Sequence, residues 1–168
     1  MKILAIDPGS RCSGYAAILV SKNKVHYLGS GVLKFEKNNF LQRVSEIFET
    51  TSKHFKNFEY DVLALETLIN VKNVNSLAKL SQARGALICA ATQGRSIDTY
   101  EYSPNLVKSS VAGFGHADKI SVQKSLEIIF QEKFKFKTHD ESDALAIAYC
   151  CALSLGAGFQ AKQQKEIR

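Results

Sequence analysis

The first third of the chain consists of short apolar runs separated by polar turns, a pattern typical of β-strands. Apolar runs cover residues 2–6, 13–20 and 24–35, and the polar turns 8–10 and 21–23 separate them. Short polar turns of this kind connect antiparallel neighbours. We therefore expect a three-stranded antiparallel meander at the start of the chain.

The remainder alternates between helical periodicity and short strands. Apolar positions at helical spacing predict an amphipathic helix over about 39–55, with its inner face formed by Leu41, Val44, Ile47, Phe48, Thr51 and Phe55. Strands are expected over 61–65 and 96–102, and helices over 73–92, from Pro104, from Asp118 to about Phe130, and from Asp140 to Leu155. This order predicts a single α/β domain over 1–159, a mixed five-stranded sheet flanked by helices, and a polar tail over 160–168.

Composition narrows the choice of partner and compartment. The 168 residues carry a net charge of +6, which favours an anionic partner, either nucleic acid or a membrane surface. The apolar start is too short for a signal peptide, and no apolar run reaches the roughly 20 residues that span a bilayer. The four cysteines have no metal-ligand spacing, so we expect small buried thiols in a cytoplasmic protein.

Acidic residues occupy unusual places at the ends of apolar segments. Asp7 and Glu66 each close an apolar strand, and Asp140 and Asp143 open the last apolar helix, three residues apart and so on one face. Carboxylates rarely border buried segments unless something compensates their charge. Three of them have an ordinary structural explanation, since Asp7 could be solvated in a hairpin turn and acids at a helix start usually serve as caps. Glu66 is harder to explain in this way, because it directly follows four apolar residues.

One cause accounts for all four acids together. A pair of Mg²⁺ ions prefers carboxylate oxygens and carries out phosphodiester hydrolysis. Pro8 favours an extended Asp7, and Gly9, Ser10, Ser13 and Gly14 would form a small polar loop that a phosphate can approach. The neighbouring Glu141 makes capping alone a weaker explanation. No nucleophile with a partnering base is evident, so we interpret the chain as a metal-dependent nuclease.

Four segments of the chain resemble the RuvC family of Holliday junction resolvases. They are Asp7-Pro-Gly-Ser-Arg-Cys-Ser-Gly14, Ala64-Leu-Glu66, Ser81-Gln-Ala-Arg-Gly85 and Asp140-Glu-Ser-Asp-Ala-Leu-Ala146, and they occur in the family's order and spacing over nearly the whole chain. The resemblance implies a ribonuclease H-like fold and a homodimer that nicks opposed strands of a four-way DNA junction. It also implies that the protein acts together with the branch-migration complex RuvA-RuvB.

The resemblance also assigns residues. Asp7, Glu66, Asp140 and Asp143 fall on the family's metal-binding acids, which implies two Mg²⁺ ions per active site, with Mn²⁺ as a substitute. Lys108 and Lys119 match basic residues near the scissile phosphate. Ile69 stands where some members carry an aromatic that stacks at the junction, and an aliphatic wedge lacks that stacking. Lys72 and Arg84 are further candidate DNA contacts, and Arg84 adjoins Gly85, which suggests close helix packing, for which the dimer interface is one candidate place. His139 is either incidental or a support for the acids.

Three other functions remain open at this point. A nuclease of the same fold could cut RNA/DNA hybrids, because carboxylates recognise phosphate rather than sequence or topology. An actin-like nucleotide-binding module would need a second lobe and a second phosphate loop, which this length does not accommodate. A non-catalytic DNA-binding scaffold would have to offset four acids that oppose phosphate binding.

Overall fold

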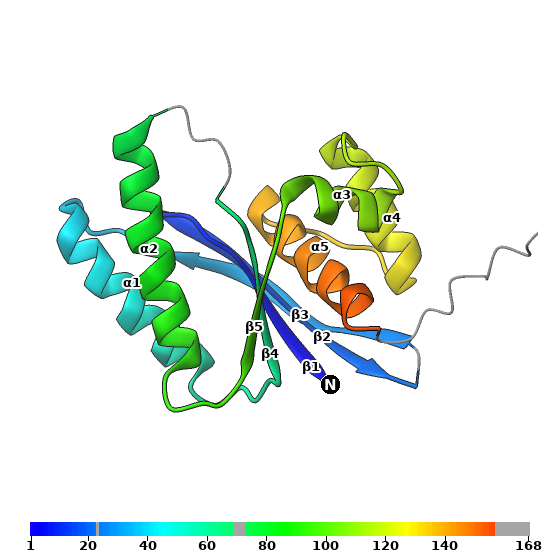
Figure 1. Cartoon of the computed structure of the whole chain (residues 1–168), viewed down its shortest axis with the longest axis horizontal. Coiled ribbons are helices and arrows are strands. Elements are labelled where there is room, and N and C mark those ends of the chain that lie inside the picture. Colours follow the sequence, from blue (N-terminus) through cyan, green and yellow to red (C-terminus); the bar gives the residue numbers. More distant parts are fainter. Residues whose placement is uncertain (23, 69–72, 157–168) are drawn as a thin grey trace, which may run out of the picture.

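A five-stranded mixed sheet forms the centre of the molecule (Figure 1). The structure is a computed structural model that describes residues 1–22, 24–68 and 73–156. The strand order is β3-β2-β1-β4-β5, in which β1–β3 are antiparallel and β4 and β5 are parallel to β1. The bounds are Lys2–Asp7 for β1, Cys12–Ser21 for β2, Lys24–Lys34 for β3, Val62–Glu66 for β4 and Asp98–Tyr102 for β5. The predicted meander and mixed sheet are confirmed.

Helices cover both faces of this sheet. The helices are α1 (Phe40–Phe55), α2 (Val74–Thr92), α3 (Pro104–Ala112), α4 (Lys119–Phe130) and α5 (His139–Ser154). Helices α1 and α2 pack on one face, α5 packs on the other, and α3 and α4 lie against α5 (Figure 1). Helix α5 is therefore enclosed between two layers, and eleven of its sixteen residues are buried.

The helices begin where the sequence offers capping side chains. Asn39, Asn73, Ser103 and Asp118 each accept hydrogen bonds from backbone N–H groups in the first turn of α1, α2, α3 and α4. The predicted cap at Asp118 is confirmed. Helix α5 differs, because its N-cap residue Thr138 makes no side-chain cap hydrogen bond.

Side chains alternate between the two faces along the central strands. On β1, Ile3 and Ala5 belong to the core beneath α5, whereas Leu4 and Ile6 belong to the core beneath α1 and α2. The same alternation runs along β4. Because successive strand residues point to opposite faces, the next residue after Ile6 points towards α5.

Several details differ from the sequence prediction. Leu41 is 72% exposed, and Arg43 takes an inner position on α1 because its Nη1 donates to the Lys37 carbonyl oxygen at 2.6 Å. The exposed Cys89 is not a buried thiol, although all four cysteines are free. Ser13 and Gly14 belong to β2 rather than to a loop.

The polar tail expected over 160–168 lies outside the described residues. In the part of the chain that the structure describes, every helix is too short or too polar to cross a bilayer.

Candidate active site

The parallel pairing of β1 and β4 brings Asp7 and Glu66 together. The paired residues run from Ile3 opposite Val62 to Ile6 opposite Leu65, so the next residue on each strand is Asp7 and Glu66. Neighbouring strands lie about 4.8 Å apart, and the alternation on both strands directs the two carboxylates towards α5. Two acids that are distant in sequence thus share one edge and one face of the sheet.

Helix α5 brings the other two acids to the same place. Its first turn packs directly on Gly14, which pairs with Asp7 across the β1–β2 ladder. A Cβ built on Gly14 would lie 1.9 Å from the Asp140 carbonyl oxygen, so only glycine permits this backbone contact. Asp140 and Asp143 are both partly buried. The predicted grouping of the four acids around one end of the sheet is therefore observed.

Asp7 has the most perturbed environment of the four acids. Its pKa is raised from 3.8 to about 8, first by burial and then by the negative charges of Asp143, Glu66 and Asp140, against which Lys119 acts in the opposite direction. Burial and Asp143 also raise the pKa of Glu66. In the free protein Asp7 therefore does not ionise readily at neutral pH beside the other carboxylates. A bound cation would relieve the repulsion between them.

Two lysines supply the positive charge at this site. The Lys119 Nζ lies 3.4 Å from Asp143 Oδ2, and both side chains are open to solvent, at 56% and 37% exposure. Lys108, on α3, acts with Lys119 to lower the pKa of Glu66, against the larger effect of burial. Both lysines that the sequence predicted near a phosphate thus lie within electrostatic range of the acids.

The fit of this site to a metal ion rests on the chemistry of its donors. Among the described residues, no group of three His, Cys, Asp or Glu side chains is arranged so that it could hold a metal ion as it stands. The carboxylates nevertheless act on one another, and they supply the hard oxygens that divalent cations prefer. The donor set fits such a cation, and binding would have to draw the carboxylates closer together.

The loop after Asp7 is a tight turn held by its own hydrogen bonds. Ser13 Oγ accepts from the Gly9 N–H at 3.0 Å and donates to the Gly9 carbonyl oxygen at 3.1 Å. A Cβ on Gly9 would lie 2.0 Å from the Cys12 carbonyl oxygen. Gly9 is therefore required by the tight turn, and the approach of a phosphate to this loop stays a prediction.

The Cys12 thiol is a neighbour of the acids that the sequence did not single out. Burial, a hydrogen bond with Asp140 and the charge of Asp140 together raise the pKa of Cys12 to about 11. The thiol therefore stays neutral beside Asp140. Cys12 stands at the start of β2, two strands from Glu66. Its closeness to the acids follows from the sheet order and could not be recognised without it.

Glu141 does not join the acids on either side of it. Its Oε1 accepts from Ser30 Oγ at 2.7 Å and its Oε2 accepts from the Lys137 N–H at 2.8 Å. The spacing Thr138-x-x-Glu141 is typical of a helix-capping box, but here the carboxylate accepts from the residue before the N-cap and Thr138 makes no cap bond. Glu141 was expected to weaken the capping explanation of the acids, yet its own carboxylate is bound at the start of the helix.

The remaining predicted site residues are not brought to the acids. Arg84 forms an ion pair with Glu101 of β5, with Nη2 and Oε1 2.5 Å apart, and a Cβ on Gly85 would meet nothing within 4 Å. Within the described residues of one chain no helix packs closely on Gly85, and the predicted packing at a dimer interface stays a prediction. His139 is exposed at the first residue of α5. Ile69 and Lys72 lie outside the described residues.

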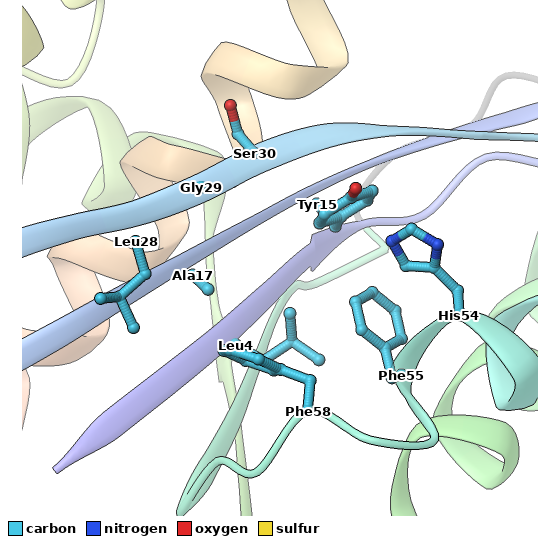
Figure 2. Close-up of a pocket in the computed structure, with 9 residues that line it drawn as sticks. All are labelled: Leu4, Tyr15, Ala17, Leu28, Gly29, Ser30, His54, Phe55 and Phe58. Atoms are coloured by element: carbon cyan, nitrogen blue, oxygen red, sulfur yellow. The ribbon is translucent and has the colours of Figure 1, made fainter.

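A separate cavity of about 280 Å³ lies between the sheet and the end of α1. In Figure 2 the side chains of Leu4, Phe55 and Phe58 surround it, with Tyr15 and His54 beside them. Leu4 and Phe55 belong to the core on the α1 and α2 side, which is the face opposite α5. This cavity is therefore distinct from the acidic site.

Comparisons with known proteins identify the family and the fold. The sequence model of the family described as "Crossover junction endodeoxyribonuclease RuvC" matches residues 3–151. A protein of that name from Pasteurella multocida is 40% identical over 94% of this chain and 82% of its own length, and one from Thermosipho melanesiensis is 34% identical over 91% and 98%. Thermus thermophilus RuvC in complex with a Holliday junction substrate superposes with a TM-score of 0.82 at 28% identity, over 94% of this chain and 97% of that one.

Proposed function

The chain belongs to the crossover junction endodeoxyribonuclease RuvC family, and on that premise we propose that it resolves four-way (Holliday) DNA junctions. It would do so by symmetric paired nicks, through metal-dependent hydrolysis of phosphodiesters, in homologous recombination and DNA repair. The ribonuclease H-like fold expected from the sequence is the fold of the Thermus thermophilus relative.

One observation carries the chemical part of this proposal. Four carboxylates from β1, β4 and α5 act on one another at one end of the sheet, and the pKa of the innermost, Asp7, is raised to about 8. Leaving such a charge uncompensated destabilises a protein, so a site of this kind is expected where a ligand cation restores the balance.

Asp7, Glu66, Asp140 and Asp143 are the residues that would hold the metal, with two Mg²⁺ ions per site and Mn²⁺ as a substitute. Such a pair supplies an activated water and stabilises the leaving oxygen. The chain contributes the fixed placement: Asp7 and Glu66 come from paired strands, and the backbone contact of Gly14 holds Asp140 beside them.

Lys119 and Lys108 would act on the phosphate of the scissile bond. In the free protein Lys119 pairs with Asp143, and both side chains are exposed, so a phosphate can reach the ammonium without displacing core residues. A positioned cation stabilises the charge that develops on the phosphate during cleavage. Lys72, Arg84 and Ile69 are proposed only as contacts to the arms of the junction, and Arg84 would first have to leave Glu101.

Two cuts in opposed strands require two active sites, so we propose a homodimer in which each subunit contributes one site. The net charge of +6 suits a DNA partner. We further propose a cytoplasmic enzyme that works with the branch-migration complex RuvA-RuvB.

The test is cleavage of a labelled synthetic four-way junction with Mg²⁺, beside chelator and Asp7→Asn controls. Paired symmetric nicks in the junction and not in linear duplex are expected, and Asp7→Asn should bind the junction without cutting it. Equal or faster cutting of an RNA/DNA hybrid would instead indicate a hybrid nuclease that uses the same metal site.

A further inference from the structure

We infer that Glu141 is a positioning residue that fixes the first turn of α5, and with it Asp140 and Asp143, through hydrogen bonds to Ser30 and to the Lys137 backbone. The inference rests on the proposed function, because its effect is exerted on the proposed metal-binding acids. It adds to the site an acidic residue that touches neither metal nor DNA.

The first step is the surroundings of the Glu141 carboxylate. The residue is only 6% exposed, and both of its oxygens are occupied, by Ser30 Oγ at 2.7 Å and by the Lys137 N–H at 2.8 Å. Ser30 Oγ in turn lies 2.7 Å from the Tyr27 hydroxyl. A buried carboxylate whose two oxygens each accept a hydrogen bond is held in one orientation.

The second step is the direction of the Ser30 hydroxyl. Ser30 pairs with Ala16 across the β2–β3 ladder, and Ala16 belongs to the core beneath α5. Figure 2 shows the Ser30 hydroxyl pointing away from Leu4, Phe55 and Phe58, on the other side of the strand. The edge strand β3 thus contributes a specific hydrogen bond to the first turn of α5, 111 residues further along the chain.

The third step is the weakness of the helix start without Glu141. Thr138, the N-cap residue, makes no cap hydrogen bond, and its Oγ1 is buried without a partner. A glutamate at the third helical position can hold the chain before the helix in place of the missing cap. The bond from the Lys137 N–H to Glu141 therefore defines where the helix begins.

The last step concerns the neighbouring acids. Gly14 sets how closely the Asp140 backbone approaches β2, and the buried side chains that begin at Ala144 hold the body of the helix. The hydrogen bond from Ser30 adds a specific side-chain contact in the first turn, where Asp140 and Asp143 lie. Because Asp140 and Asp143 lie one residue before and two after Glu141, a shift of the first turn moves both relative to Asp7, and a displacement of about 1 Å can lower a rate roughly 100-fold.

The experiment compares Glu141→Ala, Glu141→Gln and Ser30→Ala in the full chain. The glutamine can still accept from the Lys137 N–H and donate to Ser30 Oγ, whereas alanine loses both bonds. The control is Tyr60→Phe, which removes a buried hydrogen bond to the Ala91 carbonyl oxygen on the opposite face and at the other end of β4. Measurements are the single-turnover rate against Mg²⁺ concentration, junction affinity in chelator, and the rise in Tm that Mg²⁺ causes.

For Glu141→Ala we expect a maximal rate about 10- to 100-fold lower, a weaker dependence of Tm on Mg²⁺, and junction affinity within about twofold of the parent. Glu141→Gln should retain a rate within about threefold, and Ser30→Ala should fall between the two. If Glu141→Ala does not fold, Ser30→Ala carries the comparison.

Wild-type rates for Glu141→Ala or Ser30→Ala would overturn the inference. So would equal losses in Glu141→Gln and Glu141→Ala, or an equal loss in Tyr60→Phe. If the parent protein itself cuts no junction, the proposed function fails, whereas a Mg²⁺-induced Tm rise that Glu141→Ala reduces and Tyr60→Phe preserves still supports the positioning role.

Discussion

The ionisation of Asp7 should make the metal-free protein less stable as pH rises, and Asp7→Asn should remove that effect. The pKa of Asp7 is about 8 in the folded protein against 3.8 as its ordinary value. Between these two values the folded state holds a proton that the unfolded state has released. Stability is therefore greatest at low pH and falls as pH rises through this window.

The magnitude follows from the size of the shift. Each pKa unit corresponds to about 1.4 kcal/mol, so the shift sets an upper bound of roughly 6 kcal/mol at pH 8 and above. Neighbouring carboxylates and solvent can relax around a partly exposed group, so we expect about 2–4 kcal/mol in practice. Asparagine keeps the shape and cannot ionise. For a chain of this size the gain corresponds to a Tm rise of about 5–10 °C at pH 8.

The assay is thermal unfolding followed by circular dichroism in chelator, at pH 5 and pH 8. Asp98→Asn, on the exposed Asp98, is the matched control and should leave Tm unchanged. At pH 5 the advantage of Asp7→Asn should shrink to less than about half, and Mg²⁺ at pH 8 should stabilise the parent more than the variant. A variant no more stable than the parent at pH 8, or a gap independent of pH, would refute the reasoning.

Three further outcomes are expected. Lys119→Ala should lower the single-turnover cleavage rate about 10- to 100-fold with little change in junction binding; an unchanged rate would remove Lys119 from the site. Gly14→Ala should lower the free energy of unfolding by about 1–3 kcal/mol, measured by denaturant unfolding, because the added methyl meets the Asp140 backbone. Junction affinity, measured by anisotropy on Asp7→Asn, should fall linearly with the logarithm of salt concentration, and a flat dependence would contradict phosphate-dominated binding.

The elements of the fold and the four acids could be predicted because local pattern decides them. Asp7 and Glu66 follow apolar strands directly, and the three-residue spacing of Asp140 and Asp143 holds on any helix. Their meeting depends on β1 pairing in parallel with β4, which follows from the strand order and not from either strand alone.

What the sequence did not reveal depends on partners far along the chain. Glu141 is the third acid of its segment, and its inward orientation depends on a hydrogen bond from Ser30, which lies far away in the sequence. Leu41 looked like a core residue, yet Arg43 is the buried one, and two backbone carbonyl oxygens accept from its Nη1. Arg84 resembled a phosphate ligand until its partner Glu101 was known.

Because α5 is synthesised after β1 to β5, the four acids can come together only late in synthesis. Asp140 and Asp143 are supplied by the final helix, whose buried residues also complete the core on one face of the sheet. A ribosome-bound chain that has emerged only as far as α4 carries Asp7 and Glu66 without their counterparts. On the proposed function, strand cutting would therefore begin only once α5 docks onto β1 and β2.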